Sequence, residues 1–175
     1  DFNDLEHFAL QILLAEGSTP EQLLPSPAAK ALQDKYCEVM VDEYQDTNGV
    51  QEAILSLVRK KDKPNLFLVG DVKQSIYRFR LAEPELFLRK YREYPCQAAE
   101  CERIDLAQNF RSRPEILAAI NFIFAQVMSE NIAELPYGRA EELHSGPDYP
   151  KCEGCSLAGS VELDLIDADD AALSD

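Results

Sequence analysis

Apolar residues recur along this chain with two kinds of spacing. Repeats every three or four positions, as at Leu5, Phe8, Ile12 and Leu13, are typical of one face of an α-helix. Short and nearly unbroken apolar runs are typical of strands. Helices are predicted over residues 4–15, 50–58, 85–91 and 114–128. Strands are predicted over residues 36–41, 66–69 and 104–106, the first of them as a buried strand.

The order of these elements predicts the fold class. Asn3 or Asp4 is the expected N-cap of the first helix, and the proline-rich residues 17–27 are expected to form a loop around one short helical turn. Strand, helix and strand then follow in short succession, which favours right-handed crossovers on a parallel sheet. The prediction is an α/β fold with a parallel sheet flanked by helices.

Composition narrows the class of protein further. The chain has 175 residues, of which 46% are apolar and 28% charged, as in a soluble globular domain. No apolar run approaches the length of a membrane span. Five cysteines, an odd number at irregular spacing, favour a reducing cytoplasm over a secreted disulfide framework. Cys152 and Cys155 lack a second nearby pair, so a zinc site there is not favoured.

Charge is unevenly distributed. Seventeen Lys and Arg against 32 Asp and Glu give a net charge of −15, which alone argues against a nucleic-acid partner. Residues 73–92 nevertheless contain six basic and two acidic residues, a local net charge of +4, and this basic stripe is the better guide. Its basic members are Lys73, Arg78, Arg80, Arg89, Lys90 and Arg92.

Acidic residues follow the first predicted strand. The strand is followed at once by Asp42 and Glu43, and then by the polar run from Gln45 to Asn48. Nucleotide hydrolases use such a pair to hold Mg²⁺ and to orient or deprotonate water. Gly70 and Asp71 follow the second strand, with Gly70 expected to permit a tight turn. Both pairs should lie in one crevice at the carboxyl edge of the sheet. The alternative is a strand that ends in a solvated acidic turn.

A basic and aromatic segment follows Asp71. Gln74 offers both a donor and an acceptor, so it can report a phosphate without adding charge. Tyr77 and Phe79 alternate with Arg78 and Arg80, a pattern suited to stacking unpaired bases and holding a strand backbone. The alternative is a half-buried strand with alternating charges.

A third group of polar residues precedes the last predicted helix. Arg111 could stabilise charge on a transferred phosphoryl group. The alternative is a plain helix start, with Ser112 as N-cap and Arg113 and Pro114 opening the helix, and both interpretations can hold together.

Together these segments resemble motifs II, III and IV of superfamily 1A DNA helicases, the UvrD-, Rep- and PcrA-like enzymes. The simpler members usually have an acidic residue at position 73, Trp at 79 and Gly at 81, where this chain has Lys73, Phe79 and Leu81. With these differences the chain is similar to the AddA family, the helicase–nuclease subunits of bacterial AddAB recombination complexes. The motifs that carry the resemblance are residues 42–48, 70–84 and 109–112.

The resemblance implies a P-loop NTPase (RecA-like) motor domain that uses ATP and Mg²⁺. Asp42 would hold the metal, Glu43 would orient the attacking water, and Gln74 would sense the γ-phosphate. Arg111 would contact that phosphate and Phe110 would stack on the adenine. Single-stranded DNA would be contacted by Tyr77, Phe79 and Arg80, with Lys73 and Arg78 beside them.

The resemblance also implies an organisation. Residues 1–130 would form the later part of motor domain 1A, residues 131–159 a linker, and residues 160–175 the start of domain 2A, with residues 160–166 as its first strand. None of the seven glycines is followed by lysine, so the phosphate-binding Gly-Lys loop is not in this sequence. The chain is therefore expected to be a piece of a larger protein with a separate nuclease domain and an AddB-like partner subunit.

Three other functions stay open at this level. The chain could come from a simple UvrD- or PcrA-type repair helicase, or it could be a non-catalytic interaction module. It could also be a metal-dependent nuclease that uses Asp42, Glu43 and Asp71. The nuclease hypothesis leaves Gln74 and Arg111 without a role.

A first prediction concerns the 175-residue chain alone. Because no Gly-Lys loop is present to hold the phosphates, we expect it to bind ATP weakly and not to unwind DNA. The check is a steady-state assay of ATP hydrolysis with and without single-stranded DNA. Measurable DNA-stimulated hydrolysis by this chain would contradict the prediction.

Overall fold

The computed structural model describes most of the chain as two compact units. Unit 1 is Asp1–Ile104 and unit 2 is Asp105–Asp175, and each is considered by itself. Most of the strand predicted over residues 160–166 lies outside the described residues, and Cys152 and Cys155 lie outside them entirely. The domain boundaries predicted around residues 131 and 160 stay predictions. The described residues are 1–95, 101–129, 136–146, 161–162 and 164.

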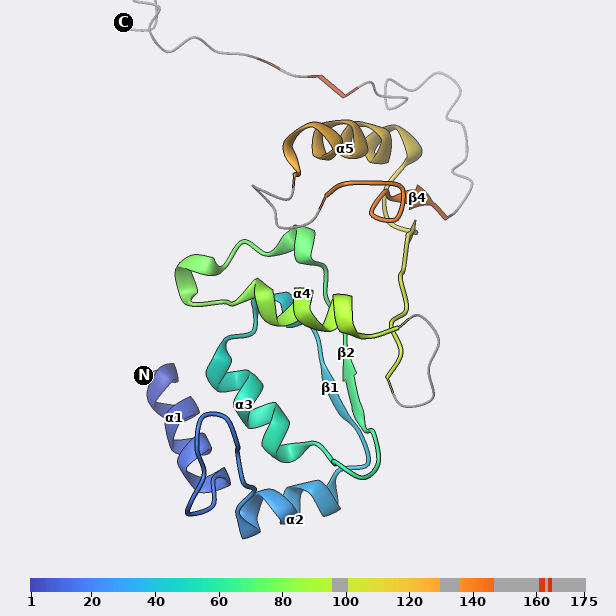
Figure 1. Cartoon of the computed structure of the whole chain (residues 1–175). Helices are drawn as coiled ribbons and strands as arrows, with labels where there is room; N and C mark the ends of the chain where they lie inside the picture. The colour runs from blue at the N-terminus through green and yellow to red at the C-terminus, as the bar shows by residue number, and fades with distance from the viewer. Residues whose placement is uncertain (96–100, 130–135, 147–160, 163, 165–175) are drawn as a thin grey trace, which may run out of the picture. The chain divides into compact units, whose positions relative to one another are not determined.

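Unit 1 combines helices with a small parallel sheet, which is consistent with the α/β prediction (Figure 1). None of the helices described anywhere in the chain is long and apolar enough to cross a lipid bilayer. The α-helices are α1 (Phe2–Leu13), α2 (Pro27–Lys35), α3 (Gly49–Val58) and α4 (Pro84–Glu93). The strands are β1 (Val39–Val41) and β2 (Leu66–Leu68), and the 3₁₀ turns are η1 (Tyr44–Asp46), η2 (Val72–Gln74) and η3 (Arg78–Arg80).

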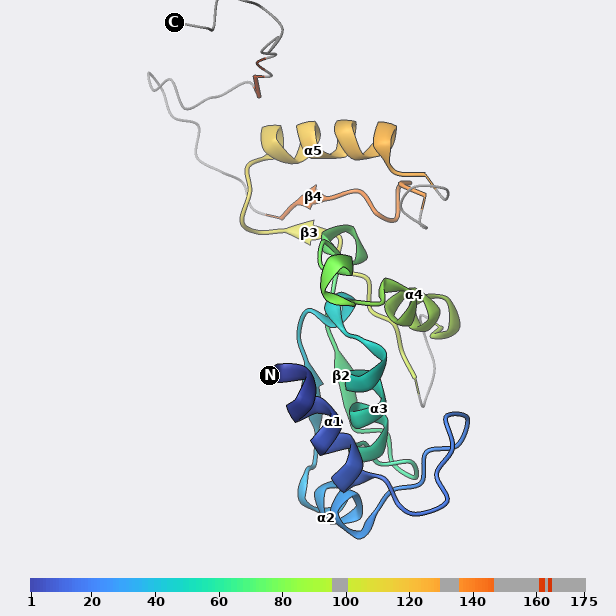
Figure 2. The same ribbon diagram turned by 90° about the vertical axis from the view of Figure 1, so that its left-hand side faces the viewer.

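The sheet forms by the predicted crossover through α3. Strands β1 and β2 pair in parallel, with Val39 opposite Leu66 and Val41 opposite Leu68. Both strands are shorter than expected, and the prediction that the first is buried is wrong: Val39 and Val41 are only partly buried and Met40 is exposed. Met40 is 68% exposed and its partner Phe67 is 56% exposed, because among the described residues nothing covers that face of the sheet. The helices α1 and α3 pack on each other (Figure 2).

The first helix lies where the pattern predicts but differs in detail. Its N-cap is Asp1, not Asn3 or Asp4, and Asp1 and Asp4 form a capping box. The buried residue of the helix is Leu13, whereas Phe8 and Ile12 are 59% and 63% exposed. The apolar repeat therefore predicts the helix correctly but does not show which apolar residues have a packing partner.

Helix α2 is absent from the sequence-based prediction, and the helical turn expected within residues 17–27 is not found there. Ser26 caps α2 by accepting the Ala29 amide, and Pro27 occupies the first turn. The Ser26 hydroxyl also donates to the Ile12 carbonyl at 2.7 Å, which links the start of α2 to the end of α1. The Ser-Pro pair was the available signal for this helix.

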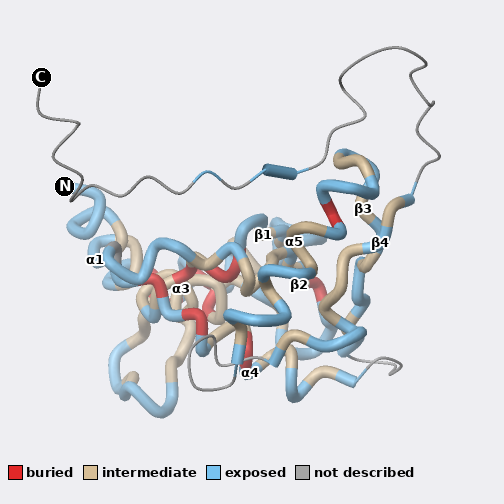
Figure 3. The backbone as a smooth tube through the Cα atoms, turned by 90° about the horizontal axis from the view of Figure 1, so that it is seen from above, coloured by how far each residue is buried: buried red, intermediate tan, exposed pale blue. Residues whose placement is uncertain are grey.

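The apolar core of unit 1 lies where α1, α2 and α3 meet. Its buried members are Leu13, Ala29 and Leu57, one from each helix. Figure 3 shows the buried positions as short stretches of the tube. Partly buried residues surround these three: Leu10, Leu14, Leu23, Leu32, Ile54 and Val58.

Unit 2 contains β3 (Gln108–Asn109), α5 (Pro114–Val127) and β4 (His144–Ser145). Strands β3 and β4 pair in parallel, and α5 packs against β4. The strand predicted over residues 104–106 is wrong: Ile104 and Leu106 are 67% and 83% exposed and lie in irregular chain. Strand pairing in unit 2 begins at Gln108, two residues after the predicted strand ends, because β4 lies opposite residues 108–109 only.

A polar cluster joins η1 to α3 and α4. The Tyr44 side chain is 1% exposed, and its hydroxyl donates to Glu52 Oε2 at 2.7 Å. Lys90 on α4 pairs with the other oxygen of Glu52 and lies over the Tyr44 ring, 5.1 Å from its centre. Burial, followed by the hydrogen bond to Glu52, raises the pKa of Tyr44 well above its ordinary value, so the hydroxyl remains a donor.

We predict that Tyr44→Phe lowers the free energy of unfolding by about 1–3 kcal/mol, because it leaves one oxygen of a half-buried carboxylate without its donor. Tyr36→Phe is the matched control, since Tyr36 is 42% exposed, and its ring contact with Lys35 survives the change. Urea unfolding of both variants checks this. Equal stability of the two variants would contradict it.

Candidate functional site

The acidic pair lies at the carboxyl end of β1, as expected. Asp42 and Glu43 are both exposed, and one oxygen of Asp42 accepts the Glu43 amide at 2.9 Å. Glu43 has a φ of 51°, a left-handed conformation that is uncommon for residues other than glycine. Such backbone strain tends to occur at functional sites. The conformation turns the chain directly from the strand into η1.

A buried glutamine connects this end of β1 to the end of β2. Gln45 is 1% exposed. Its side-chain nitrogen donates to Glu43 Oε2 at 2.7 Å, and its side-chain oxygen accepts the Asp71 amide at 3.0 Å. The carboxyl ends of the two strands are thus joined by one side chain.

Asp71 extends the connection to Gln74. Its Oδ2 accepts the Gln74 side-chain amide at 3.1 Å, while its Oδ1 accepts the Lys73 backbone amide at 3.0 Å and pairs with the Lys73 ammonium at 2.9 Å. Glu43 and Gln74, which lie on separate segments of the chain, are therefore connected through Gln45 and Asp71. We call Glu43, Gln45, Asp71 and Gln74 the Gln45 network.

Gly70 has a different role from the expected tight turn. Of the described glycines only Gly17 has a positive φ, so Gly70 does not require glycine for its backbone angles. Its neighbours leave no room for a side chain instead: a Cβ there would lie 2.6 Å from Gln45 Oε1 and 3.0 Å from the Phe87 ring. Gly70 therefore allows the Gln45 amide to lie against the backbone.

Asp46 is a further acid near this site. Burial raises its pKa above the ordinary value, and the charge of Glu43 raises it further. Its Oδ1 is buried and has no hydrogen-bond partner among the described residues. The sequence-based prediction gave roles to neither Gln45 nor Asp46. The available signal was a polar run directly after a strand, of which Gln45 and Thr47 are both buried.

The segment after Gln74 carries exposed aromatic residues on 3₁₀ structure. The alternative of a half-buried strand is wrong, since residues 78–80 form η3. Tyr77 is 38% exposed and Phe79 is 75% exposed, with ring centres 5.8 Å apart. We call Tyr77, Arg78 and Phe79 the aromatic strip. The side chain of Arg80 is outside what the structure describes.

Leu81 closes η3 in a left-handed conformation with a φ of 66°. The simpler superfamily 1A helicases usually have Gly at this position, and glycine adopts such a φ without a steric penalty. The backbone here therefore has the shape that a glycine would favour, although leucine occupies the position.

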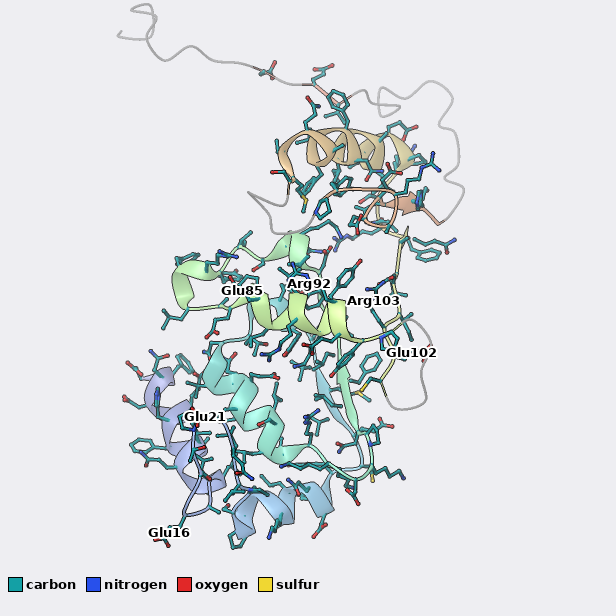
Figure 4. The ribbon with its side chains drawn as sticks, viewed as in Figure 1. Glu16, Glu21, Glu85, Arg92, Glu102 and Arg103 are labelled. Carbon is teal, nitrogen blue, oxygen red and sulfur yellow. The ribbon has the colours of Figure 1, made fainter. Side chains whose placement is uncertain are left out.

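Part of the predicted basic stripe is neutralised by nearby acids. Lys73 pairs with Asp71, Arg78 with Glu85 at 3.3 Å, and Lys90 with Glu52. The Lys73 side chain is 18% exposed, so its charge lies at the Asp71 turn and is not extended into solvent. The Arg78 and Glu85 side chains are 57% and 61% exposed, so that pair is weak. Figure 4 shows Glu85 and Arg92 at opposite ends of α4.

A hollow beside η3 is lined by the start of α1, the start of α3 and residues 78–85. Three glutamates contribute to its wall: Glu6, Glu83 and Glu85. Glu83 also accepts the Gly49 amide at 2.9 Å, which stabilises the start of α3. Arg78, which pairs with Glu85, also lines the hollow, so three glutamates stand beside one arginine in its wall.

The third predicted group lies in unit 2. Asn109 Oδ1 accepts the backbone amides of Arg111 at 2.9 Å and Ser112 at 2.8 Å. The expected N-cap Ser112 is wrong: α5 is preceded by Arg113, whose side chain makes no capping bond. Arg111 is exposed, and Phe110 is 69% exposed with its ring close to Gly146. The convergence of Arg111 with Glu43 and Gln74 on one nucleotide stays a prediction.

Comparison with known proteins supports one family. Residues 1–95 match the UvrD/REP helicase N-terminal domain. The chain is 55% identical to an ATP-dependent helicase/nuclease subunit of Desulforudis audaxviator over 93% of its length. It is 53% identical to the protein of the same name in Desulforamulus reducens over its whole length, and 56% identical to that of Listeria welshimeri over 95%. The chain spans about 14% of the length of these relatives. It belongs to the UvrD/REP helicase family.

Proposed function

We propose that this chain is part of a motor that couples ATP hydrolysis to movement along single-stranded DNA and to unwinding of the duplex in double-strand break repair. The observation that carries the proposal is the Gln45 network, which connects a carboxylate at the end of β1 with the polar turn after β2. Family membership and the printed names of the relatives support the same activity.

Asp42 is suited to hold Mg²⁺. Its carboxylate is exposed at the strand end, and Oδ2 has no hydrogen-bond partner among the described residues. Carboxylate oxygens are the protein ligands that Mg²⁺ prefers, and one or two of them with phosphate oxygens and water complete the usual site. When bound, the ion would neutralise charge on the phosphates of ATP.

Glu43 is proposed to orient the attacking water. The free oxygen Oε1 can accept a proton from water, because the hydrogen bond from Gln45 is made to Oε2. Gln74 is exposed and can reach a γ-phosphate while its amide remains next to Asp71. From unit 2, Arg111 would contact the same phosphate and Phe110 would stack on the adenine.

The aromatic strip is proposed to bind single-stranded DNA. Exposed aromatic rings stack on unpaired bases of any sequence, and Arg78 can exchange its weak pair with Glu85 for a phosphate. Arg80 is proposed to join this surface. Lys73 contributes differently from the first expectation, since its pairing with Asp71 assigns it to the turn of the Gln45 network.

The name that the relatives share, which describes one subunit of a helicase/nuclease, suggests the setting of the whole protein. We propose that its partner is a second, AddB-like subunit and that a nuclease site lies elsewhere in the protein. A nuclease centred on Asp71 is disfavoured, because Lys73 and Gln74 engage both oxygens of that carboxylate. No particular contact favours a simple UvrD- or PcrA-type helicase or an interaction module over this proposal.

In the full-length protein we predict that Glu43→Gln lowers the kcat of DNA-stimulated ATP hydrolysis by about 10²–10⁴-fold, the range for a lost general base. Glu38→Gln is the matched control, since Glu38 is exposed and precedes β1 at the opposite end of the strand. Initial rates at saturating ATP and DNA measure the effect. Retention of kcat in Glu43→Gln would refute the proposed function.

The DNA-binding proposal is tested by Tyr77→Ala and Phe79→Ala. Each lost stacking contact is worth about 1–3 kcal/mol, so we expect the Kd for single-stranded DNA to rise roughly 5- to 150-fold. Tyr36→Ala is the control, because Tyr36 has similar exposure to Tyr77 and lies before β1, away from the site. Fluorescence anisotropy with a labelled oligonucleotide gives the Kd. Equal affinity of all three variants would exclude the strip as a binding surface.

A further inference from the structure

We propose that Gln45 is a positioning residue for ATP hydrolysis: it holds the Glu43 carboxylate in place and connects it to the turn that carries Gln74. This inference rests on the proposed function and extends it to a residue with no role in the sequence-based prediction. The evidence is a single buried side chain with one hydrogen bond to each of the two segments.

The chemistry of the two partners fixes the orientation of the Gln45 amide. A carboxylate only accepts hydrogen bonds, and a backbone N–H only donates. The NH₂ group must therefore face Glu43, and the carbonyl oxygen must face Asp71, as observed. A flipped amide would place oxygen against oxygen and N–H against N–H. Only a side chain with a donor and an acceptor on one group can satisfy both partners.

The surroundings keep this amide in place. Gln45 is 1% exposed, so water cannot substitute for either partner. The backbone of Gly70 lies against its oxygen so closely that a Cβ there would come within 2.6 Å. A buried amide held on two sides transmits a displacement at one partner to the other.

The orientation of the Glu43 carboxylate depends on the hydrogen bond from Gln45. Its backbone has a left-handed φ of 51°, its side chain is exposed, and the bond from Gln45 is the one side-chain hydrogen bond that it makes within the described residues. Without that bond the carboxylate would sample several rotamers, and only one of them places Oε1 for catalysis. The loss would therefore affect kcat more than the binding of ATP.

The test uses Gln45→Met and Gln45→Glu in the full-length protein. Methionine keeps the volume and removes both hydrogen bonds. Ionised glutamate keeps an acceptor for the Asp71 amide but has no donor for Glu43. We expect both variants to lower kcat by about 10- to 100-fold, with the KM for ATP and the Kd of a fluorescent ATP analogue changed less than about threefold.

Gln33→Met is the matched control. Gln33 is partly buried and donates to the Leu57 carbonyl at 2.6 Å, away from the Gln45 network, so it also loses a structural hydrogen bond. Thermal unfolding should show similar shifts for Gln33→Met and Gln45→Met, whereas only the latter should lose kcat. An equal loss of kcat in both would show a general structural effect and overturn the inference.

Gln45→Glu separates positioning of Glu43 from a purely structural link. If Gln45 only anchored the Asp71 turn, glutamate would serve equally and kcat would be unchanged, which would refute the inference. Combining Gln45→Met with Glu43→Gln should cost no further activity beyond Glu43→Gln alone, since the positioned group is then gone. If Glu43→Gln is inactive while the Gln45 variants are fully active, this inference is refuted and the proposed function stands. If Glu43→Gln is active, the proposed function itself is refuted.

Discussion

The parallel pairing of β1 with β2 is the constraint on which the site depends. The ladder continues past the strands themselves, with Val69 donating to the Val41 carbonyl and Tyr44 donating to the Val69 carbonyl, both at 2.9 Å. Parallel pairing brings both carboxyl ends to one edge, so two segments about thirty positions apart in the sequence emerge side by side. The one contact of the Gln45 network that crosses between these segments, from the Asp71 amide to Gln45 Oε1, depends on that pairing, whereas the bonds from Gln45 to Glu43 and from Gln74 to Asp71 are local in the sequence.

Much of the fold could be predicted from periodicity, and the exceptions have physical causes. Helices α1, α3, α4 and α5 and both strands of unit 1 lie close to their predicted positions. Helix α2 could not be predicted from apolar spacing, since Leu32 is its one large apolar residue and only Ala29 is buried within it. Apolar character also does not predict burial, as Phe8 and Met40 show, because burial requires a partner that a local pattern cannot supply.

The candidate site was predicted only in part, because some of its contacts form only in the folded chain. The segments that contain Glu43 and Gln74 are distinctive in sequence, whereas the link between them is made by Gln45 and exists only once two strands pair. The count of basic residues along the chain was also an incomplete guide to the charge of this surface. It identified Lys73 and Arg78 as basic but could not show that each has a carboxylate beside it. Pairing depends on the tertiary fold, which spacing along the chain does not contain.

The uncovered side of the two-stranded sheet has a consequence for the behaviour of the chain in solution. Met40 and Phe67 form an apolar surface, and among the described residues each strand has an unpaired edge. Open edges of this kind are templates for strand addition between molecules. The net charge of −15 opposes such association through mutual repulsion, and salt screens that repulsion. Colloidal stability of the chain should therefore decline as ionic strength increases.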